Sequence, residues 1–202
     1  MDETFWNERY SQPEYVYGTD PNTFLQASIS HFPTTGCVLC LAEGEGRNAL
    51  FLAQQGYEVW AVDISASGKE KAEKLAREHG VSFEYIVANV NDFDFGEKTW
   101  DVIVSISAHT DPNTRKRVYR KSLKGLKENG IFILESYHPK QLQYETGGPK
   151  NVEWLVTLND LIPYFSGQQI IHQRETERDV REGTFHTGKA FVTQFICKKI
   201  SS

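Results

Sequence analysis

One stretch of the sequence, CVLCLAEGEGRNALFLA at residues 37–53, decides the fold. The apolar run at 37–42 predicts a buried strand. The glycines Gly44 and Gly46 follow, and residues 47–54 then have the pattern of a helix. A buried strand, a glycine-rich turn and a helix in this order are typical of an α/β protein with a parallel sheet.

The same alternation continues along the chain. Short apolar runs predict further strands at 59–62, 83–87, 102–106 and 131–134. We expect helices between them, one reaching about His79 before Gly80 and a basic one ending near Gly130.

The last third of the chain departs from this rhythm. Thr157 and Asp160 mark a helix start, with the spacing of a capping box. The stretches 168–174 and 190–197 predict two consecutive strands. Two such strands suggest an antiparallel hairpin at one edge of the sheet.

Size and composition are those of an ordinary globular protein. The 202 residues fit one α/β domain, and 39% of them are hydrophobic and 24% charged. No apolar run approaches the ~18 residues that span a membrane, and the N-terminus is acidic where a signal peptide would be basic. We therefore expect a cytoplasmic protein without a membrane segment.

The net charge of −5 argues against a surface that binds nucleic acid, although the segment 115–127 is strongly basic. Apolar residues recur in that segment at helical spacing, so the basic side chains occupy mostly the other face. We interpret them as a solvated helix face. A docking patch for an acidic partner is the second interpretation.

Cys37 and Cys40 have the C-x-x-C spacing of some redox and metal sites. Residues three apart in a strand, however, point to opposite faces. No second Cys or His pair lies nearby in the sequence. We therefore expect core cysteines and no metal site.

Residues 1–31 stand outside the alternation of strands and helices. We expect this N-terminal segment to be irregular. Its many aromatic side chains predict that it packs over the sheet or over a ligand. They are Phe5, Trp6, Tyr10, Tyr15, Tyr17 and Phe24.

Ligands of a parallel sheet bind at the carboxyl ends of the strands, where the strand order reverses. Gly44, Gly46 and Ala49 match the G-x-G-x-x-A fingerprint of dinucleotide-binding loops. Asp63 lies near the distance expected of the ribose-binding acid. The motif alone leaves the class of cofactor open.

The charge of the loop favours one class. Glu43 and Glu45 would repel the pyrophosphate of a nicotinamide dinucleotide. S-adenosylmethionine has no phosphate and carries a positive sulfonium and a positive ammonium. The acidic loop therefore favours S-adenosylmethionine, and a nicotinamide-dependent oxidoreductase is the weaker alternative.

Two polar residues follow the next predicted strands. Asp63 can accept hydrogen bonds from both ribose hydroxyls, and it can at the same time cap the helix that follows. Asn89 can bind an adenine edge or serve as a turn residue.

Six segments carry a family resemblance: FWNERY at 5–10, GEGRNA at 44–49, VDIS at 62–65, ANV at 88–90, WDVIVS at 100–105 and LKENG at 126–130. With them the chain resembles class I S-adenosylmethionine-dependent methyltransferases, and it looks closest to the small bacterial branch related to tellurite-resistance and thiopurine methyltransferases. The resemblance implies a Rossmann-like three-layer sandwich. Its seven-stranded sheet would be mostly parallel, with an antiparallel last strand.

This resemblance also implies one methyltransferase domain over residues 1–202. Within it, residues 1–31 would form an aromatic lid and residues 37–136 the cofactor-binding core. Residues 157–199 would form a helix and the antiparallel hairpin.

The resemblance implies S-adenosylmethionine as the cofactor and S-adenosylhomocysteine as its product. The residues expected to bind it are Trp6 and Tyr10 as a lid, Glu43, Gly44 and Gly46 in the loop, Asp63 and Ile64 at the ribose, Asn89 and Val90 at the adenine, and Ser105 and Ile106 at the methionine part.

Two positions depart from the family pattern. The family often has an acid within the first strand and a glycine before the loop, where this chain has Cys40 and Ala42. Glu43 would then supply the acid from a shifted position. The same departures motivate an alternative, a non-catalytic or degenerate protein that binds S-adenosylmethionine.

Methyl transfer is an in-line displacement at an activated sulfonium, so positioning supplies much of the catalysis. A general base is needed only where the acceptor loses a proton. The candidates are His109, Tyr137 and His186, with His109 first because it follows the carboxyl end of a strand.

The acceptor is expected to be a small molecule. The aromatic N-terminal segment and the lack of an appended recognition domain favour that choice over a nucleic acid. We expect a monomer or a homodimer.

Overall fold

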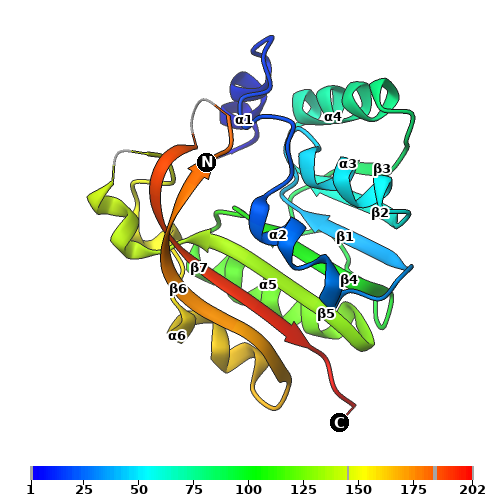
Figure 1. Ribbon diagram of the computed structural model, residues 1–202, viewed down its shortest axis with the longest axis vertical. Helices are drawn as coiled ribbons and strands as arrows, with labels where there is room; N and C mark the ends of the chain where they lie inside the picture. Colours follow the sequence, from blue (N-terminus) through cyan, green and yellow to red (C-terminus); the bar gives the residue numbers. More distant parts are fainter. Residues whose placement is uncertain (1, 145, 184–185, 202) are drawn as a thin grey trace.

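The computed structural model of the protein describes residues 2–144, 146–183 and 186–201. Within these ranges seven strands form one sheet, in the order β3-β2-β1-β4-β5-β7-β6 (Figure 1). The strands are β1 (Cys37–Leu41), β2 (Glu58–Asp63), β3 (Glu84–Val87), β4 (Trp100–Ile106), β5 (Leu126–Tyr137), β6 (Gln169–Arg181) and β7 (Thr187–Lys198).

Strands β1 to β5 pair in parallel, and β7 runs antiparallel to both of its neighbours, β5 and β6. Figure 1 shows β6 and β7 side by side as a long hairpin, with β6 at the edge of the sheet. The predicted fold class, a mostly parallel seven-stranded sheet with an antiparallel last strand, is confirmed.

Helices cover both faces of the sheet. They are α1 (Glu3–Tyr10), α2 (Thr23–Ala27), α3 (Arg47–Gln54), α4 (Ala66–Glu78), α5 (Pro112–Gly125) and α6 (Leu158–Leu161), with short 3-10 turns at Ile29–His31, Pro139–Gln143, Val152–Trp154 and Ile162–Phe165. Apolar side chains of α2, α3 and α4 form one core cluster with one face of the sheet. Side chains of α5, α6 and residues 162–165 form a second cluster with the other face.

Alternate residues of β1 point into these two clusters, because successive side chains of a strand face opposite ways. Val38 and Cys40 lie in the first cluster, and Leu39 and Leu41 lie in the second. Cys37 packs against the second cluster, so the two cysteines of the C-x-x-C spacing do lie on opposite faces. Both are free thiols.

The central position of β1 brings the site together. Leu41 at the end of β1 pairs with Val62 of β2 on one side and with Ser105 of β4 on the other. The chain crosses from β1 to β2 on one side and returns to β4 on the other, so the strand order reverses here. The loops that follow β1, β2 and β4 therefore meet at one edge of the sheet.

The N-terminal segment is helical in part, which corrects the expectation of an irregular segment. The Asp2 side chain caps α1 by accepting a hydrogen bond from the Phe5 N–H at 3.0 Å. Asn22 caps α2 in the same way through the Leu25 N–H at 3.0 Å. The apolar residues of α1 form no single stripe, so apolar periodicity did not reveal the helix.

Helix α5 ends at Gly125 and not near Gly130, a second correction. A Cβ atom at Gly125 would lie 3.0 Å from the Phe95 carbonyl oxygen, so a larger residue would require this neighbour to shift. Leu126 then has extended backbone and begins β5. The predicted start of α6 is confirmed, because Thr157 and Asp160 form a capping box.

Most basic side chains of α5 already have partners. Lys124 pairs with Glu97 at 2.5 Å, and the Lys121 ammonium donates to the backbone carbonyls of Asn91 and Phe93. This engagement favours the interpretation of a solvated helix face. Across the described part of the chain, no helix is long and apolar enough to cross a membrane.

Candidate active site

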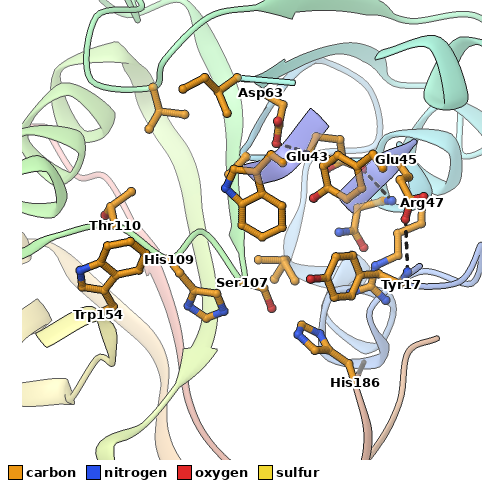
Figure 2. A pocket seen from close by; sticks show the side chains of 18 of the residues that line it. Tyr17, Glu43, Glu45, Arg47, Asp63, Ser107, His109, Thr110, Trp154 and His186 are labelled. Atoms are coloured by element: carbon orange, nitrogen blue, oxygen red, sulfur yellow. Dashed lines mark hydrogen bonds between the residues drawn. The ribbon is translucent and has the colours of Figure 1, made fainter. Parts of the chain in front are cut away.

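A cavity of about 310 Å³ opens at the carboxyl ends of β1, β2 and β4, within the size range of small-molecule sites. In Figure 2, Asp63 and Glu43 lie on one side of it, and Ser107, His109 and His186 lie on the other. We call these the donor end and the ring end. The N-terminal segment contributes Trp6, Tyr10, Tyr17 and Gly18 to the lining.

Left-handed backbone shapes the loop after β1. Ala42 has φ 51°, Gly44 has φ 63° and Gly46 has φ 90°. A Cβ atom at Gly44 would lie 2.6 Å from the Tyr10 Oη, so glycine lets the aromatic lid residue approach the loop. Ala42 adopts the conformation that favours glycine, at the position where the family resemblance expects one.

Glu43 is buried, with 8% of its surface exposed, and it lines the donor end. Its Oε1 accepts hydrogen bonds from the Asn48 and Ala49 N–H groups, both at 2.8 Å, at the start of α3. Burial raises the pKa of this carboxyl to about 7, against the opposing effect of those N–H groups. Its carboxyl is also a hydrogen-bond partner of the Cys40 thiol, so the acid lies beside the position where the resemblance expects one.

Glu45, the second acid of the loop, also lines the cavity. Its carboxylate accepts from the Val16 and Tyr17 N–H groups at 3.2 Å and pairs with Lys71 at 2.7 Å. The charge of Glu45 is therefore balanced, and its bonds hold the N-terminal segment to the loop. Glu43 and Asp63 are consequently the acids that can attract a cationic ligand, and Glu45 is not.

Asp63 lies at the end of β2 with 6% of its surface exposed. Its Oδ2 accepts from the Gly44 N–H and its Oδ1 from the Ser65 N–H, both at 2.9 Å. The Ile64 N–H is a further backbone donor to this carboxylate, whose acceptor sites are then not all used, so it can still accept from a ligand hydroxyl. The cap of α4 is Ser65 and not Asp63, which removes the alternative interpretation of Asp63 as a helix cap.

The other residues predicted at the donor end fall into two groups. Those that line the cavity are Trp6, Tyr10, Gly44, Ile64, Asn89, Val90 and Ile106. Trp6 stacks on Tyr10 with ring centroids 5.4 Å apart. The Asn89 side-chain oxygen accepts from the Asn91 N–H at 2.9 Å, as a turn residue does.

Two predicted residues lie outside the lining. Gly46 is the N-cap of α3, and a Cβ atom there would lie 2.6 Å from the Ala72 Cβ, so this glycine lets α3 pack against α4. Ser105 is buried within β4, and Ser107 lines the cavity instead.

The three predicted catalytic residues come together at the ring end. His109 stacks on Tyr137 with ring centroids 5.6 Å apart. The His186 ring lies edge-on to the same tyrosine, with ring centroids 5.2 Å apart. His109 and His186 line the cavity, whereas Tyr137 lies behind them. The ring centroids of Tyr17 and His186 are 4.5 Å apart. We call these four residues the ring cluster: Tyr17, His109, Tyr137 and His186.

Both histidines of the ring cluster are neutral at physiological pH. Burial lowers the pKa of His109 to about 3, and the neighbouring His186 and Arg115 act in the same direction. Burial also lowers the pKa of His186 to about 4. Neither His109 ring nitrogen has a hydrogen-bond partner among the described residues, and the same holds for His186 Nδ1.

A buried ionic network supports the ring end. Arg47 pairs with Glu182 at 2.6 Å, and Arg178 pairs with Glu135 at 2.5 Å and with Glu182 at 2.8 Å. The Asn22 amide donates to both glutamates. The network carries two positive and two negative charges, and it ties α2 and α3 to the hairpin.

Tyr17 was expected only as one aromatic residue of the N-terminal segment, and sequence reasoning missed several other residues of the lining: Arg47, Asn48, Ser107, Thr110, Asp111, Thr114 and Trp154. Four of them follow the carboxyl end of β4 directly, which is the signal that identified His109. Trp154 comes from a distant 3-10 turn and had no such signal. Among the described residues, no group of three or more His, Cys, Asp or Glu could hold a metal ion.

Comparisons with known proteins agree with this geometry. A family model described as a methyltransferase domain matches residues 38–130. The ubiquinone biosynthesis O-methyltransferase of Rickettsia conorii is 27% identical over 110 residues, which are 54% of this chain and 38% of the relative. The chain therefore spans less than half the length of this relative.

Two solved structures share the fold across most of the chain. An S-adenosylmethionine-dependent methyltransferase from Methanosarcina mazei matches with a TM-score of 0.71 and 20% identity, covering 91% of this chain and 100% of that one. TehB from Haemophilus influenzae matches with a TM-score of 0.74 and 14% identity, covering 98% and 66%. Residues 38–130 thus match a methyltransferase domain, and the chain has the fold of solved S-adenosylmethionine-dependent methyltransferases.

Proposed function

We propose that the protein transfers the methyl group of S-adenosylmethionine to a small-molecule acceptor. The observation that carries the proposal is the shared cavity. It joins a carboxylate-lined donor end, suited to a cationic cofactor, to a ring end of neutral histidines and aromatic residues.

The donor end fits the cofactor by its chemistry. Asp63 keeps acceptor capacity for a ribose hydroxyl, and Glu43 offers a carboxyl group to the ammonium. Asn89 and Val90 would border the adenine, and Trp6 and Tyr10 would cover the cofactor. When bound, S-adenosylmethionine supplies an activated methyl group on its sulfonium.

The same end suits a pyrophosphate poorly. The cations closest to the loop are already paired, Arg47 with Glu182 and Lys71 with Glu45. A dinucleotide would therefore bring its negative charges next to two buried acids, with both of these cations already engaged.

The chain's own contribution is positioning and the exclusion of water. The N-terminal segment closes over the cavity and is held by the bonds to Glu45. Such enclosure fixes the reacting groups near each other, and positioning alone can supply a large share of the rate. His109 stands at the ring end to accept a proton from an acceptor that must lose one, with Tyr137 and His186 orienting its ring.

The size of the cavity supports a small acceptor. The basic side chains of α5 support it too, because several already bind protein groups and are less available to a nucleic acid. The name of the Rickettsia relative, which refers to ubiquinone biosynthesis, is that of an enzyme with a small-molecule substrate. The narrower likeness to tellurite-resistance and thiopurine methyltransferases stays a prediction.

The test is a methyl-transfer screen with isotopically labelled S-adenosylmethionine over thiol, phenol, carboxylate and amine acceptors. Labelled product from at least one small acceptor is the expected result. Tight binding of S-adenosylhomocysteine without any transfer would favour the non-catalytic alternative. Absence of both transfer and binding would contradict the proposal.

A further inference from the structure

A second cavity, of about 360 Å³, lies behind one wall of the active cavity. Thr114 and Trp154 line the active cavity, where Figure 2 shows Trp154, and their chain neighbours Arg115 and Glu153 line the second one. The Arg115 Nη1 donates to the Glu153 carbonyl at 3.0 Å and so joins the two parts of this wall. Among the described residues, none lines both cavities, so the second cavity is a separate space.

Arg115 brings a buried positive charge to the second cavity. The residue is 8% exposed, and the one hydrogen bond of its guanidinium goes to a neutral carbonyl. Within the described part of the chain, its Nε and Nη2 have no partner, yet they are not among the atoms that are shut off from solvent. A ligand in the cavity can therefore reach them. Because a buried cation without a counter-charge is costly, an anion is the ligand that this position favours.

The shape of the guanidinium indicates which anion fits. Nε and Nη2 form one edge of the planar group, and their two parallel N–H bonds match the two oxygens of a carboxylate. Two acids, Glu153 and Asp160, also line the cavity, and both are exposed. A polyphosphate would bring several further negative charges close to these acids, whereas a carboxylate brings only one. The charges of the lining therefore favour a ligand with a single carboxylate.

The rest of the lining is largely apolar. Four apolar residues line the cavity: Pro112, Pro139, Val152 and Leu155. The Val152 side chain is 51% exposed, which is a high value for a large apolar residue. Covering apolar surface of this kind is favourable in water. The ligand is therefore expected to have an apolar body next to its carboxylate.

We propose that the second cavity is a binding site for a small carboxylate with an apolar body. The carboxylate pairs with Nε and Nη2 of Arg115, and the apolar body covers Val152. This site goes beyond the proposed function, because its ligand is neither the cofactor nor the methyl acceptor. Since the two cavities have different linings, the carboxylate and the cofactor can be bound at the same time.

The test compares two ligands with the same ring system, 2-naphthoate and the neutral 2-naphthamide, by isothermal titration calorimetry. We expect naphthoate to bind the wild-type protein at least about tenfold more tightly, the worth of a hydrogen bond to a charged group. Its affinity should be the same with and without saturating S-adenosylhomocysteine. Loss of naphthoate binding in the presence of S-adenosylhomocysteine would place the ligand in the active cavity and overturn the inference.

Arg115→Met removes the charge and keeps most of the volume of the side chain. This variant should bind the two ligands equally. Arg120→Met is the matched control, because Arg120 is exposed on the same helix and lines neither cavity. It should keep the wild-type preference for naphthoate. A preference that survives in Arg115→Met would overturn the inference.

Val152→Asp is a second variant, which avoids the buried wall because the side chain is exposed. It places a negative charge where the apolar body should lie, so naphthoate should bind about fivefold more weakly or worse. Leu142→Asp is its control, at a side chain that is 44% exposed and outside the lining. Equal affinities in the two variants would contradict the site. The proposed function is judged separately, by S-adenosylhomocysteine binding and methyl transfer without naphthoate.

Discussion

Two features of the surroundings of Glu43 have opposite effects on its pKa. Its carboxyl must stay buried beside Cys40, and it must also accept two N–H groups from the start of α3. Burial has the larger effect, because the pKa of Glu43 rises to about 7 in spite of the two N–H hydrogen bonds. The position of Glu43 in the sequence indicated an acid at the loop, but its burial and its bonds depend on the folded α3.

This pKa predicts how Glu43 affects stability. Its folded pKa of about 7 exceeds the reference value of 4.5, so the folded state binds a proton that the unfolded state has lost. The contribution of Glu43 is therefore fully favourable below about pH 4.5, is lost as the pH rises through 7, and amounts to on the order of 3 kcal/mol.

Glu43→Gln removes this titration and keeps an oxygen for the α3 N–H groups. Denaturant unfolding at pH 5 and pH 8 should show that the variant gains stability relative to wild type at pH 8. Because other groups titrate equally in both proteins, the difference between them isolates Glu43. An equal change with pH in both proteins would show that the carboxyl titrates normally.

Asp63 carries the second prediction at the residue scale. Asp63→Ala should weaken S-adenosylhomocysteine binding by roughly 1–3 kcal/mol, because ribose hydroxyls would be buried without acceptors. Asp179→Ala on the exposed edge strand β6 is the control and should bind as wild type. Full-strength binding by Asp63→Ala in calorimetry would refute the ribose contact.

At the scale of elements, strands were easier to predict than helices. The runs that became β1, β2 and β4 are buried on both faces, so they are continuously apolar and visible in the sequence. Helix α1 depends on a polar cap and on packing against α4, where Asn7 accepts from the Ser65 hydroxyl and the Ser67 N–H. Those partners lie almost 60 residues away, so a local pattern could not reveal them.

The attachment of the N-terminal segment gives a prediction for Lys71. Its ammonium donates to Glu45 at 2.7 Å and to the Glu14 carbonyl, and both Lys71 and Glu45 are largely shielded from water. Lys71→Met leaves a buried carboxylate unpaired, so we expect a loss of roughly 3 kcal/mol in unfolding free energy. S-adenosylhomocysteine should also bind more weakly, since the segment covers the cavity.

Lys69→Met is the matched control, two residues earlier on the same helix. Lys69 forms an exposed pair with Glu73 at 3.6 Å, and such pairs contribute ~0.5 kcal/mol or less. Equal losses in the two variants, measured by urea unfolding, would show that the Lys71 contact does not hold the segment.

At the scale of the whole molecule, the site assembles from segments far apart in the sequence. Residues after β1, β2 and β4 could be predicted, because the carboxyl ends of parallel strands share one edge. The ionic network could not be predicted, since Asn22 and Glu182 lie on different layers and meet only in the folded chain. Their pairing left no periodic pattern in the sequence.

Because several basic side chains at the surface are already paired, we expect methyl-transfer activity to depend only weakly on salt. In α5, Lys124 pairs with Glu97 and Lys121 donates to backbone carbonyls, and Lys127 at the start of β5 pairs with Asp101. Methyl transfer to a small acceptor should change less than about twofold between 50 and 200 mM salt. A drop of 10³-fold or more in binding over that range would instead indicate phosphate contacts and a nucleic-acid acceptor.

The central claim is that the acidic cavity at the end of β1 binds the methyl donor and not a dinucleotide. Isothermal titration calorimetry with S-adenosylhomocysteine and, separately, with NADPH tests it most directly. We predict saturable one-to-one binding of S-adenosylhomocysteine and no heat of binding with NADPH. Binding of NADPH without binding of S-adenosylhomocysteine would contradict the claim.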